Sequence, residues 1–288
     1  WLGILKCNKK QLIIGSVLGV LWTKYVWQEF VVQASAQPFE LLTYKGSSQM
    51  ITKYVNYHDG NTQLEGYLVY DEADIPKPAV LIAHDWTGRR DFACRAAERV
   101  AGMGYIGFAL DMYGKGVFGA NGDIAGNAAL MNPFATNRAL LRQRIRAALD
   151  TVRTLSQVDA ANVVVMGYCF GGMCALELAR SGATIKGAIS IHGILSPGHI
   201  ANEKITAKVL CLHGHDDPMV PPEQVLAFET EMTKAGVDWQ MHIYGGTLHA
   251  FTNPDANNPS FGTVYKEVAA NRAYQSIANF LGEVFHSC

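Results

Sequence analysis

The sequence predicts an α/β fold in which a mostly parallel central sheet is flanked by helices and begins with an antiparallel edge hairpin. Two observations carry this prediction. Apolar strand-like segments alternate with helical patterns from about residue 79 onward, and two alternating segments surround the turn residues Asp59-Gly60-Asn61. The chain has 288 residues, 49% of them hydrophobic, so it can bury a sizeable core without disulfides or metals.

The individual elements follow from periodicity. Residues 51–58 and 63–70 alternate apolar and polar side chains, as expected of the hairpin. Residues 79–83 form a continuous apolar run, which is typical of a strand covered on both faces. Further strands are expected at residues 105–110, 163–166, 185–191, 208–212 and 239–243. Helical spacing predicts helices at residues 91–103, 137–155, 171–180, 222–235 and 264–285, and the Gly-rich interval 114–126 is the longest expected loop.

Charge and cysteine content exclude several classes of function. Lys and Arg total 24 against 25 Asp and Glu, so the sequence offers no basic footprint for nucleic acid. Arg138, Arg142, Arg146 and Arg153 are expected to form a solvated helix face, and Glu177 an exposed or capping charge. The six cysteines include no C-x-x-C pair, which argues against a zinc or redox site, and most of them are expected in the core.

The N-terminal segment has the composition of a targeting sequence. Lys6, Lys9 and Lys10 precede an apolar run at residues 12–22, and Ala34-Ser35-Ala36 follows. This layout predicts a signal peptide or an uncleaved anchor over residues 1–36, ahead of a single domain over residues 37–288. The run is shorter than the roughly 20 apolar residues that span a bilayer. A periplasmic or secreted protein is therefore expected, with a cytoplasmic one as the alternative.

The strongest functional signal is the segment G-Y-C-F-G-G, residues 167–172, which joins an apolar strand to a helix. It has the layout of the nucleophile elbow G-x-S-x-G with Cys169 in the place of serine. The glycines permit a very tight turn, and the start of a helix favours a thiolate. The alternative is a closely packed turn that happens to contain a buried cysteine. The segment lacks the lysine of a phosphate-binding loop and does not match the dinucleotide fingerprint.

An acid and a histidine follow Cys169 in the order that such a fold requires. Asp216 and Asp217 come after the strand at 208–212, and His249 comes after the strand at 239–243. Both loops follow the carboxyl ends of strands, where open α/β sheets bind ligands. Asp216 stays an alternative to Asp217 as the acid. The other histidines near strand ends are expected to pack and form hydrogen bonds: His84, His192, His213 and His215.

The motifs G-Y-C-F-G-G, H-G-H-D-D-P-M-V-P and G-G-T-L-H-A-F resemble those of the dienelactone hydrolase family, whose members have the α/β-hydrolase fold. The resemblance runs from roughly residue 53 to residue 285. It implies Cys169 as nucleophile, Asp217 as the acid that orients the histidine, and His249 as base. It also implies that the reaction needs neither a metal nor an organic cofactor.

Two positions depart from the family pattern. The family has a glutamate that contacts the resting cysteine, and the matching residue here is Asp85, one methylene shorter. The family also has an arginine that helps to hold a substrate carboxylate, and Lys115 stands at that place without a guanidinium fork. With these two changes, the resemblance still implies hydrolase activity in general, but it does not imply hydrolysis of dienelactone itself. The backbone N–H groups of Phe170 and Trp86 are expected to hold the oxyanion.

The sequence thus predicts a hydrolase of small carboxylic esters or lactones that works through a Cys-His-Asp triad and a thioester acyl-enzyme. Two alternatives remain open. One is an acyltransferase or thioesterase on the same triad, and the other is a binding protein without catalysis. The segments 113–134 and 251–261 are expected to shape the pocket.

Overall fold

The computed structural model describes residues 50–73 and 75–286. The expected signal peptide or anchor at residues 1–36 lies outside this part of the chain, so it stays a prediction. Within the described ranges, no helix is both long and apolar enough to cross a membrane.

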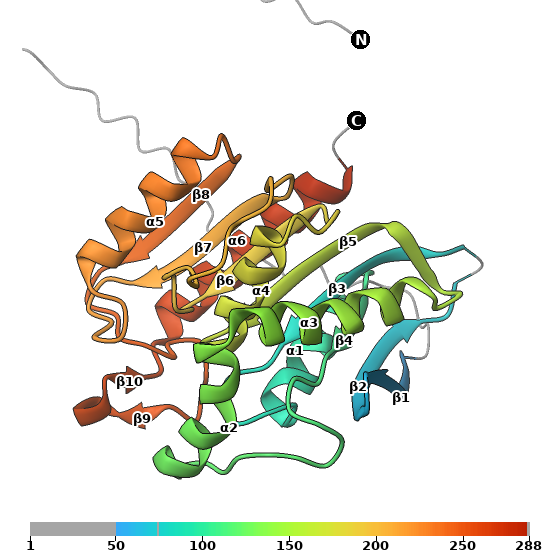
Figure 1. Cartoon of the computed structure of the whole chain (residues 1–288), viewed down its shortest axis with the longest axis horizontal. Helices are drawn as coiled ribbons and strands as arrows, with labels where there is room; N and C mark the ends of the chain where they lie inside the picture. Colours follow the sequence, from blue (N-terminus) through green and yellow to red (C-terminus); the bar gives the residue numbers. More distant parts are fainter. Residues whose placement is uncertain (1–49, 74, 287–288) are drawn as a thin grey trace, which may run out of the picture. The chain divides into compact units, whose positions relative to one another are not determined.

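An eight-stranded sheet forms the centre of the fold, in the order β1-β2-β4-β3-β5-β6-β7-β8 (Figure 1). Its strands are β1 (Met50–Asp59), β2 (Thr62–Asp71), β3 (Lys77–Ala83), β4 (Ile106–Ala109), β5 (Val158–Tyr168), β6 (Gly187–Ile191), β7 (Lys208–Gly214) and β8 (Trp239–Tyr244). β1 pairs antiparallel with β2, and β2 with β4, whereas all other neighbours are parallel. The predicted mostly parallel sheet with an antiparallel N-terminal hairpin is confirmed.

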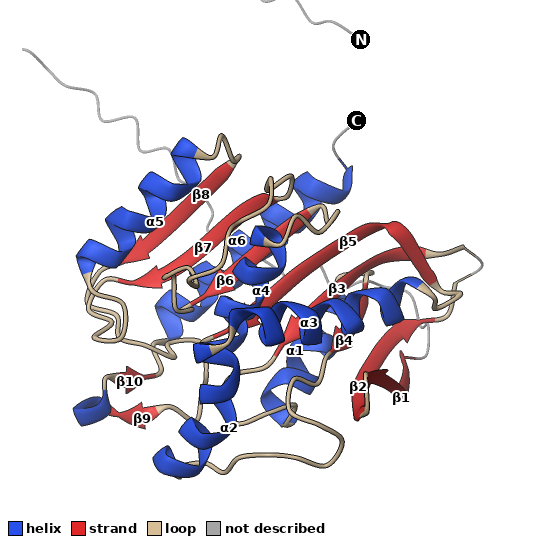
Figure 2. Cartoon of the chain, viewed as in Figure 1, coloured by secondary structure: helices blue, strands red, loops and turns tan. Residues whose placement is uncertain are grey.

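Helices lie on both faces of this sheet, and the described part of the chain has six of them (Figure 2). They are α1 (Asp91–Gly102), α2 (Ile124–Thr136), α3 (Arg138–Arg153), α4 (Phe170–Arg180), α5 (Pro222–Lys234) and α6 (Glu267–His286). α1 and α6 pack their apolar side chains on one face, and α3, α4 and α5 pack theirs on the other. Strands such as β5 therefore lie between two hydrophobic cores, and the β5 residues from Val163 to Tyr168 are all buried.

The sequence did not predict helix α2 or the small hairpin of β9 (Asn257–Asn258) and β10 (Thr263–Val264). α2 carries Pro133 in its interior and buries only Asn127 and Phe134, so it lacks an amphipathic period. A strand of two residues is too short to show any period. The final helix, expected from residue 264, begins at Glu267 because this hairpin occupies the preceding residues.

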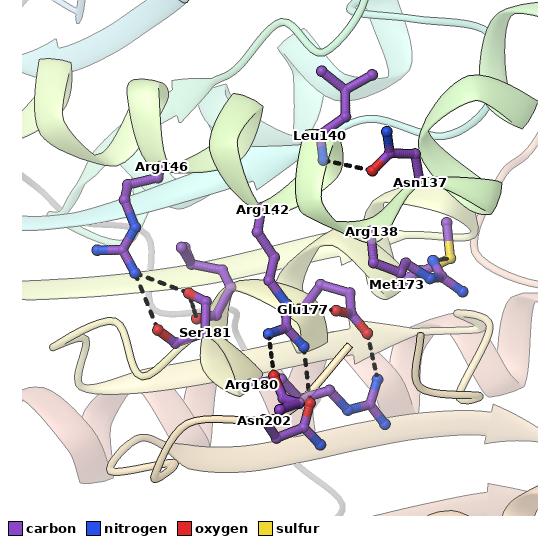
Figure 3. A network of polar contacts seen from close by, with 12 residues as sticks. Asn137, Arg138, Leu140, Arg142, Arg146, Met173, Glu177, Arg180, Ser181 and Asn202 are labelled. Atoms are coloured by element: carbon purple, nitrogen blue, oxygen red, sulfur yellow. Dashed lines mark hydrogen bonds and ion pairs between the residues drawn. The ribbon is translucent and has the colours of Figure 1, made fainter. Parts of the chain in front are cut away.

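A largely buried cluster of charges joins helices α3, α4 and α5, and Figure 3 shows its members on α3 and α4. The expected solvated face is wrong for Arg138 and Arg142, and the expected exposure of Glu177 is wrong as well. Glu177 and Arg180 are fully buried. Arg142 donates to Glu177 Oε2 at 2.9 Å, and Arg180 donates to Glu177 Oε1 at 3.2 Å. Arg180 also donates to both carboxylate oxygens of Glu231, at 2.9 and 2.7 Å. Helical periodicity cannot reveal such a cluster, because its partners come from three separate helices.

Replacing Glu177 with alanine tests the importance of this cluster. The substitution leaves the buried guanidinium of Arg180 without one of its carboxylates, which should lower the free energy of unfolding by about 3 kcal/mol or more. Asp150→Ala, an exposed acid on α3, should change it by less than about 0.5 kcal/mol. Urea unfolding of the two variants provides the measurement, and equal losses would show that the cluster is not stabilising.

Candidate active site

Cys169 occupies a strained turn between β5 and α4. Its backbone has φ 55° and ψ −114°, a region that residues other than glycine rarely adopt. Two hydrogen bonds hold it there: its N–H donates to the Ile191 carbonyl at 3.0 Å, and its carbonyl accepts from Gly172 N at 3.0 Å. The elbow predicted from the sequence thus has the geometry that lifts a side chain above the end of the sheet.

The glycines around Cys169 are required by close backbone contacts. A Cβ atom on Gly167 would collide with the carbonyl of Gly171. A Cβ atom on Gly171 would collide with the carbonyl of Ala83, at the end of β3. The elbow can therefore close only because neither position carries a side chain.

Asp217 and His249 form a buried hydrogen-bonded pair. His249 Nδ1 lies 2.7 Å from Asp217 Oδ2, and each residue is at most 3% exposed. The other carboxylate oxygen, Oδ1, accepts from the backbone N–H of Met219 at 2.9 Å. Asp216, the alternative acid, is exposed, and its N–H donates to the Thr247 carbonyl. Of the two adjacent acids, only Asp217 contacts the histidine.

The His249 ring lies close to Cys169. Burial by itself would lower the pKa of this imidazole, but the neighbouring Cys169 and the hydrogen bond with Asp217 outweigh burial and raise the pKa to about 10. Nε2 has no hydrogen-bond partner among the described residues, so it is the ring atom left for proton exchange. A charged imidazolium is thus stabilised beside the thiol.

The small hairpin β9–β10 fixes the backbone of His249. Its N–H donates to the Gly262 carbonyl at 2.9 Å, and its carbonyl accepts from Val264 N at 3.1 Å. The following residue, Ala250, has φ 56°, a second strained position. This support was not predictable from the sequence, because it comes from strands of only two residues.

The loop after β3 is held against the elbow by an aromatic cluster. The hydroxyl of Tyr113 donates to the Trp86 carbonyl at 3.0 Å, and its ring stacks on Phe170 at 5.8 Å between centroids. Trp86 itself stacks on Phe261 of the β9–β10 segment at 5.6 Å. Since β3 pairs directly with β5, the Trp86 loop and Phe170 are neighbours at the same end of the sheet.

The two residues that depart from the family pattern lie in different places. Asp85 lines the pocket with Cys169, but its Oδ1 accepts from Thr87 N at 2.8 Å and from Thr87 Oγ1 at 2.6 Å. Lys115 does not line the pocket: its ammonium pairs with Glu65 at 2.9 Å and donates to Asn56 at 2.8 Å. This placement gives no support to the expected contact between Lys115 and substrate.

His192, one of the histidines near strand ends, lines the pocket and has the expected role of packing and forming a hydrogen bond. It follows β6, has φ 39°, and packs edge-on against His249 at 5.1 Å between ring centroids. Its Nε2 lies 2.8 Å from the hydroxyl of Thr252. Burial, together with the neighbouring His249, lowers the pKa of His192 well below its usual value. A neutral ring therefore supports His249 without competing for its proton.

These side chains open onto a pocket of about 690 Å³ at the carboxyl ends of the strands. The segments expected to shape it, 113–134 and 251–261, both contribute. Its walls are largely apolar, and the residues that provide them are Trp86, Ile124, Met131, Ile194, Met219 and Phe261. Among the residues that the structure describes, no group of three or more His, Cys, Asp or Glu side chains could hold a metal ion.

Comparison with known proteins decides the family. The model of the dienelactone hydrolase family matches residues 64–285. The chain belongs to this family. A curated protein of Aquifex aeolicus, "Putative carboxymethylenebutenolidase", is 26% identical over 234 residues, covering 78% of this chain and 96% of that protein.

Solved structures of this family have the same fold. A dienelactone hydrolase-like promiscuous phosphotriesterase from metagenomic libraries has a TM-score of 0.78 and 34% identity, covering 82% of this chain and 99% of that one. A dienelactone hydrolase of Anabaena variabilis has a TM-score of 0.56 and 18% identity, with 80% and 96% covered. The chain is thus a hydrolase-family member with the α/β-hydrolase fold.

The histidine His84 should make this protein sensitive to mild acid. Its Nε2 accepts from the Met112 N–H at 3.2 Å, and burial lowers its pKa below the usual value. The folded state keeps the ring neutral, so its contribution to stability is present above the unfolded pKa of about 6.5 and is lost as the pH falls toward the lower folded pKa.

Urea unfolding between pH 7.5 and 5.5 measures this effect. Stability of the wild type should fall below pH 6.5, and His84→Gln should reduce that slope by up to about 1.4 kcal/mol per pH unit. The window stays above the range in which carboxylates titrate. An unchanged slope in the variant would contradict a neutral buried His84.

Proposed function

We propose that this protein hydrolyses small carboxylic esters with Cys169 as nucleophile, His249 as general base and Asp217 as the acid that orients the imidazole. The observation that carries the proposal is the conjunction of a strained cysteine elbow with the buried Asp217–His249 pair of 2.7 Å, all at one end of the sheet. Nucleophile, base and orienting acid are the groups that covalent acyl transfer requires.

The reaction follows from these positions. His249 holds the proton of the Cys169 thiol, and the thiolate attacks the ester carbonyl carbon. As the tetrahedral intermediate collapses, the bond to the alcohol oxygen breaks, the imidazolium donates its proton to that oxygen, and a thioester remains on Cys169. His249 then takes a proton from water, whose oxygen attacks the thioester, releasing the carboxylic acid and restoring the thiol.

The oxyanion of each intermediate needs hydrogen-bond donors above the elbow. Phe170 is the first residue of α4, and a helix leaves the N–H groups of its first turn without intrahelical partners. Trp86 lies in the neighbouring loop, which the Tyr113 hydroxyl holds by its carbonyl. We assign the N–H groups of Phe170 and Trp86 to this role, in which one donor typically contributes about 3–4 kcal/mol.

Substitution of Cys169 tests the nucleophile directly. Cys169→Ala should lower kcat/KM for a p-nitrophenyl ester at least about a thousandfold, and iodoacetamide should inactivate the wild type. Cys94→Ala, which removes a partly exposed cysteine on α1, should keep activity within about twofold. Activity that survives in Cys169→Ala would reject the proposed triad.

The adjacent acids provide a matched pair for the orienting role. Asp217→Asn should lower kcat at least about a hundredfold, because the amide can no longer stabilise the imidazolium of His249. Asp216→Asn changes an exposed side chain and should leave kcat within about twofold. Steady-state kinetics on the same ester distinguishes them, and the reverse order of effects would transfer the role to Asp216.

A second candidate reaction is hydrolysis of neutral phosphotriesters. It is favoured by the 34% identity to the promiscuous phosphotriesterase, which spans 99% of that protein. The same thiolate would attack phosphorus and displace the alcohol, which takes its proton from His249. Water, losing a proton to His249, would then break the S–P bond, and the cysteine would recover its proton. Release of p-nitrophenol from diethyl p-nitrophenyl phosphate, lost in Cys169→Ala, would establish this activity, and no release above the variant's level would exclude it.

A further inference from the structure

The charged side chains around the pocket are mainly acidic. Asp85 and Asp255 line it, and within the described ranges no lysine or arginine does. The raised pKa of His249 makes its ring positive, but this charge is paired with the Asp217 carboxylate, whose Oδ2 lies 2.7 Å from Nδ1. The remaining lining consists of apolar groups, amides, hydroxyls and the neutral His192.

Three cations of the segments around the site are engaged elsewhere. The Lys115 ammonium pairs with Glu65, and so does Arg89, at 2.8 Å. Arg89 is 5% exposed and lies over the ring of Tyr54 at 5.2 Å. Arg138, at the start of α3, is also buried, against the sulfur of Met173. None of these three cations lines the pocket, so an anionic group inside it would have no counterion from them.

The two acids lie in the wall and at the rim of the pocket. Asp85 is fixed in the wall by its two hydrogen bonds with Thr87. Asp255 is 63% exposed at the rim, and its cation partner, Arg95, is 4.0 Å away and itself half exposed. An exposed pair at this distance neutralises little of the carboxylate field. A substrate carboxylate would therefore meet like charges and lose its hydration without a partner.

We infer that this pocket takes uncharged substrates and rejects esters that carry a carboxylate near the scissile bond. The apolar wall of Trp86, Met131, Ile194, Met219 and Phe261 binds the neutral acyl or alcohol part. This substrate class rests on the proposed ester hydrolase function. An arginine at position 115 would favour a substrate with a carboxylate. In this protein Asp85 and Asp255 disfavour such a substrate.

A pair of esters tests the inference on the full chain. The p-nitrophenyl monoester of adipic acid carries a carboxylate, and its methyl ester has the same acyl chain without the charge. The neutral ester should have a kcat/KM about tenfold or more higher, the size expected for like charges within about 10 Å near a protein surface. Equal values, or a preference for the anion, would overturn the inference.

Alkylation of Cys169 gives a readout that does not depend on turnover. Neutral iodoacetamide should modify Cys169 about tenfold or more faster than iodoacetate, after division by the same ratio for 2-mercaptoethanol, with the modified peptide followed by mass spectrometry. If neither ester is hydrolysed but this preference holds, the hydrolase proposal fails and the charge selection of the pocket stands. A preference for iodoacetate would reject the charge selection even in an active enzyme.

Two substitutions locate the source of selection. Asp255→Asn should narrow the preference for the neutral ester about two- to threefold, because one of the two negative charges is removed. Lys115→Met should leave the preference within about twofold, since Lys115 does not line the pocket. A selective loss of activity on the anionic ester in Lys115→Met would assign the substrate carboxylate to Lys115 and overturn the inference.

Discussion

The turn at Cys169 is the constraint around which the rest of the protein is organised. A cysteine at φ 55° is held only if its surroundings compensate the strain, which is on the order of 1–3 kcal/mol. The compensation comes from hydrogen bonds with Ile191 and Gly172 and from the absence of side chains at Gly167 and Gly171. Strands β3, β5 and β6 must therefore stay in register for the sulfur to lie at the end of the sheet.

Buried charge holds the helix that begins at this turn. α4 packs on the sheet beside α3, and its buried Glu177 and Arg180 form ion pairs with Arg142 of α3 and Glu231 of α5. Such pairs are a weak source of net stability but are costly to break on one side only. They tie the orientation of α4 to that of its neighbours, and thereby the position of the elbow at its N-terminus.

The pKa values of the histidines near the elbow shift in opposite directions. Burial keeps His84 and His192 neutral, whereas Cys169 and Asp217 raise the pKa of His249 and so favour its protonated form. The neutral rings pack and form hydrogen bonds, so one imidazole is left to carry the proton. This division of roles depends on which partner each ring meets and not on the residue type.

The sequence by itself determined the α/β fold, because alternating apolar runs and helical periods leave few other topologies, and it located Cys169, Asp217 and His249 through short motifs at strand ends. It could not choose between Asp216 and Asp217 by local chemistry alone, and only the tertiary structure decided which carboxylate meets His249. The sequence also could not predict that Glu177 is buried, that Lys115 pairs with Glu65, or that a small hairpin holds His249. Each of these depends on contacts between segments far apart in the chain, which hydrophobic periodicity does not encode.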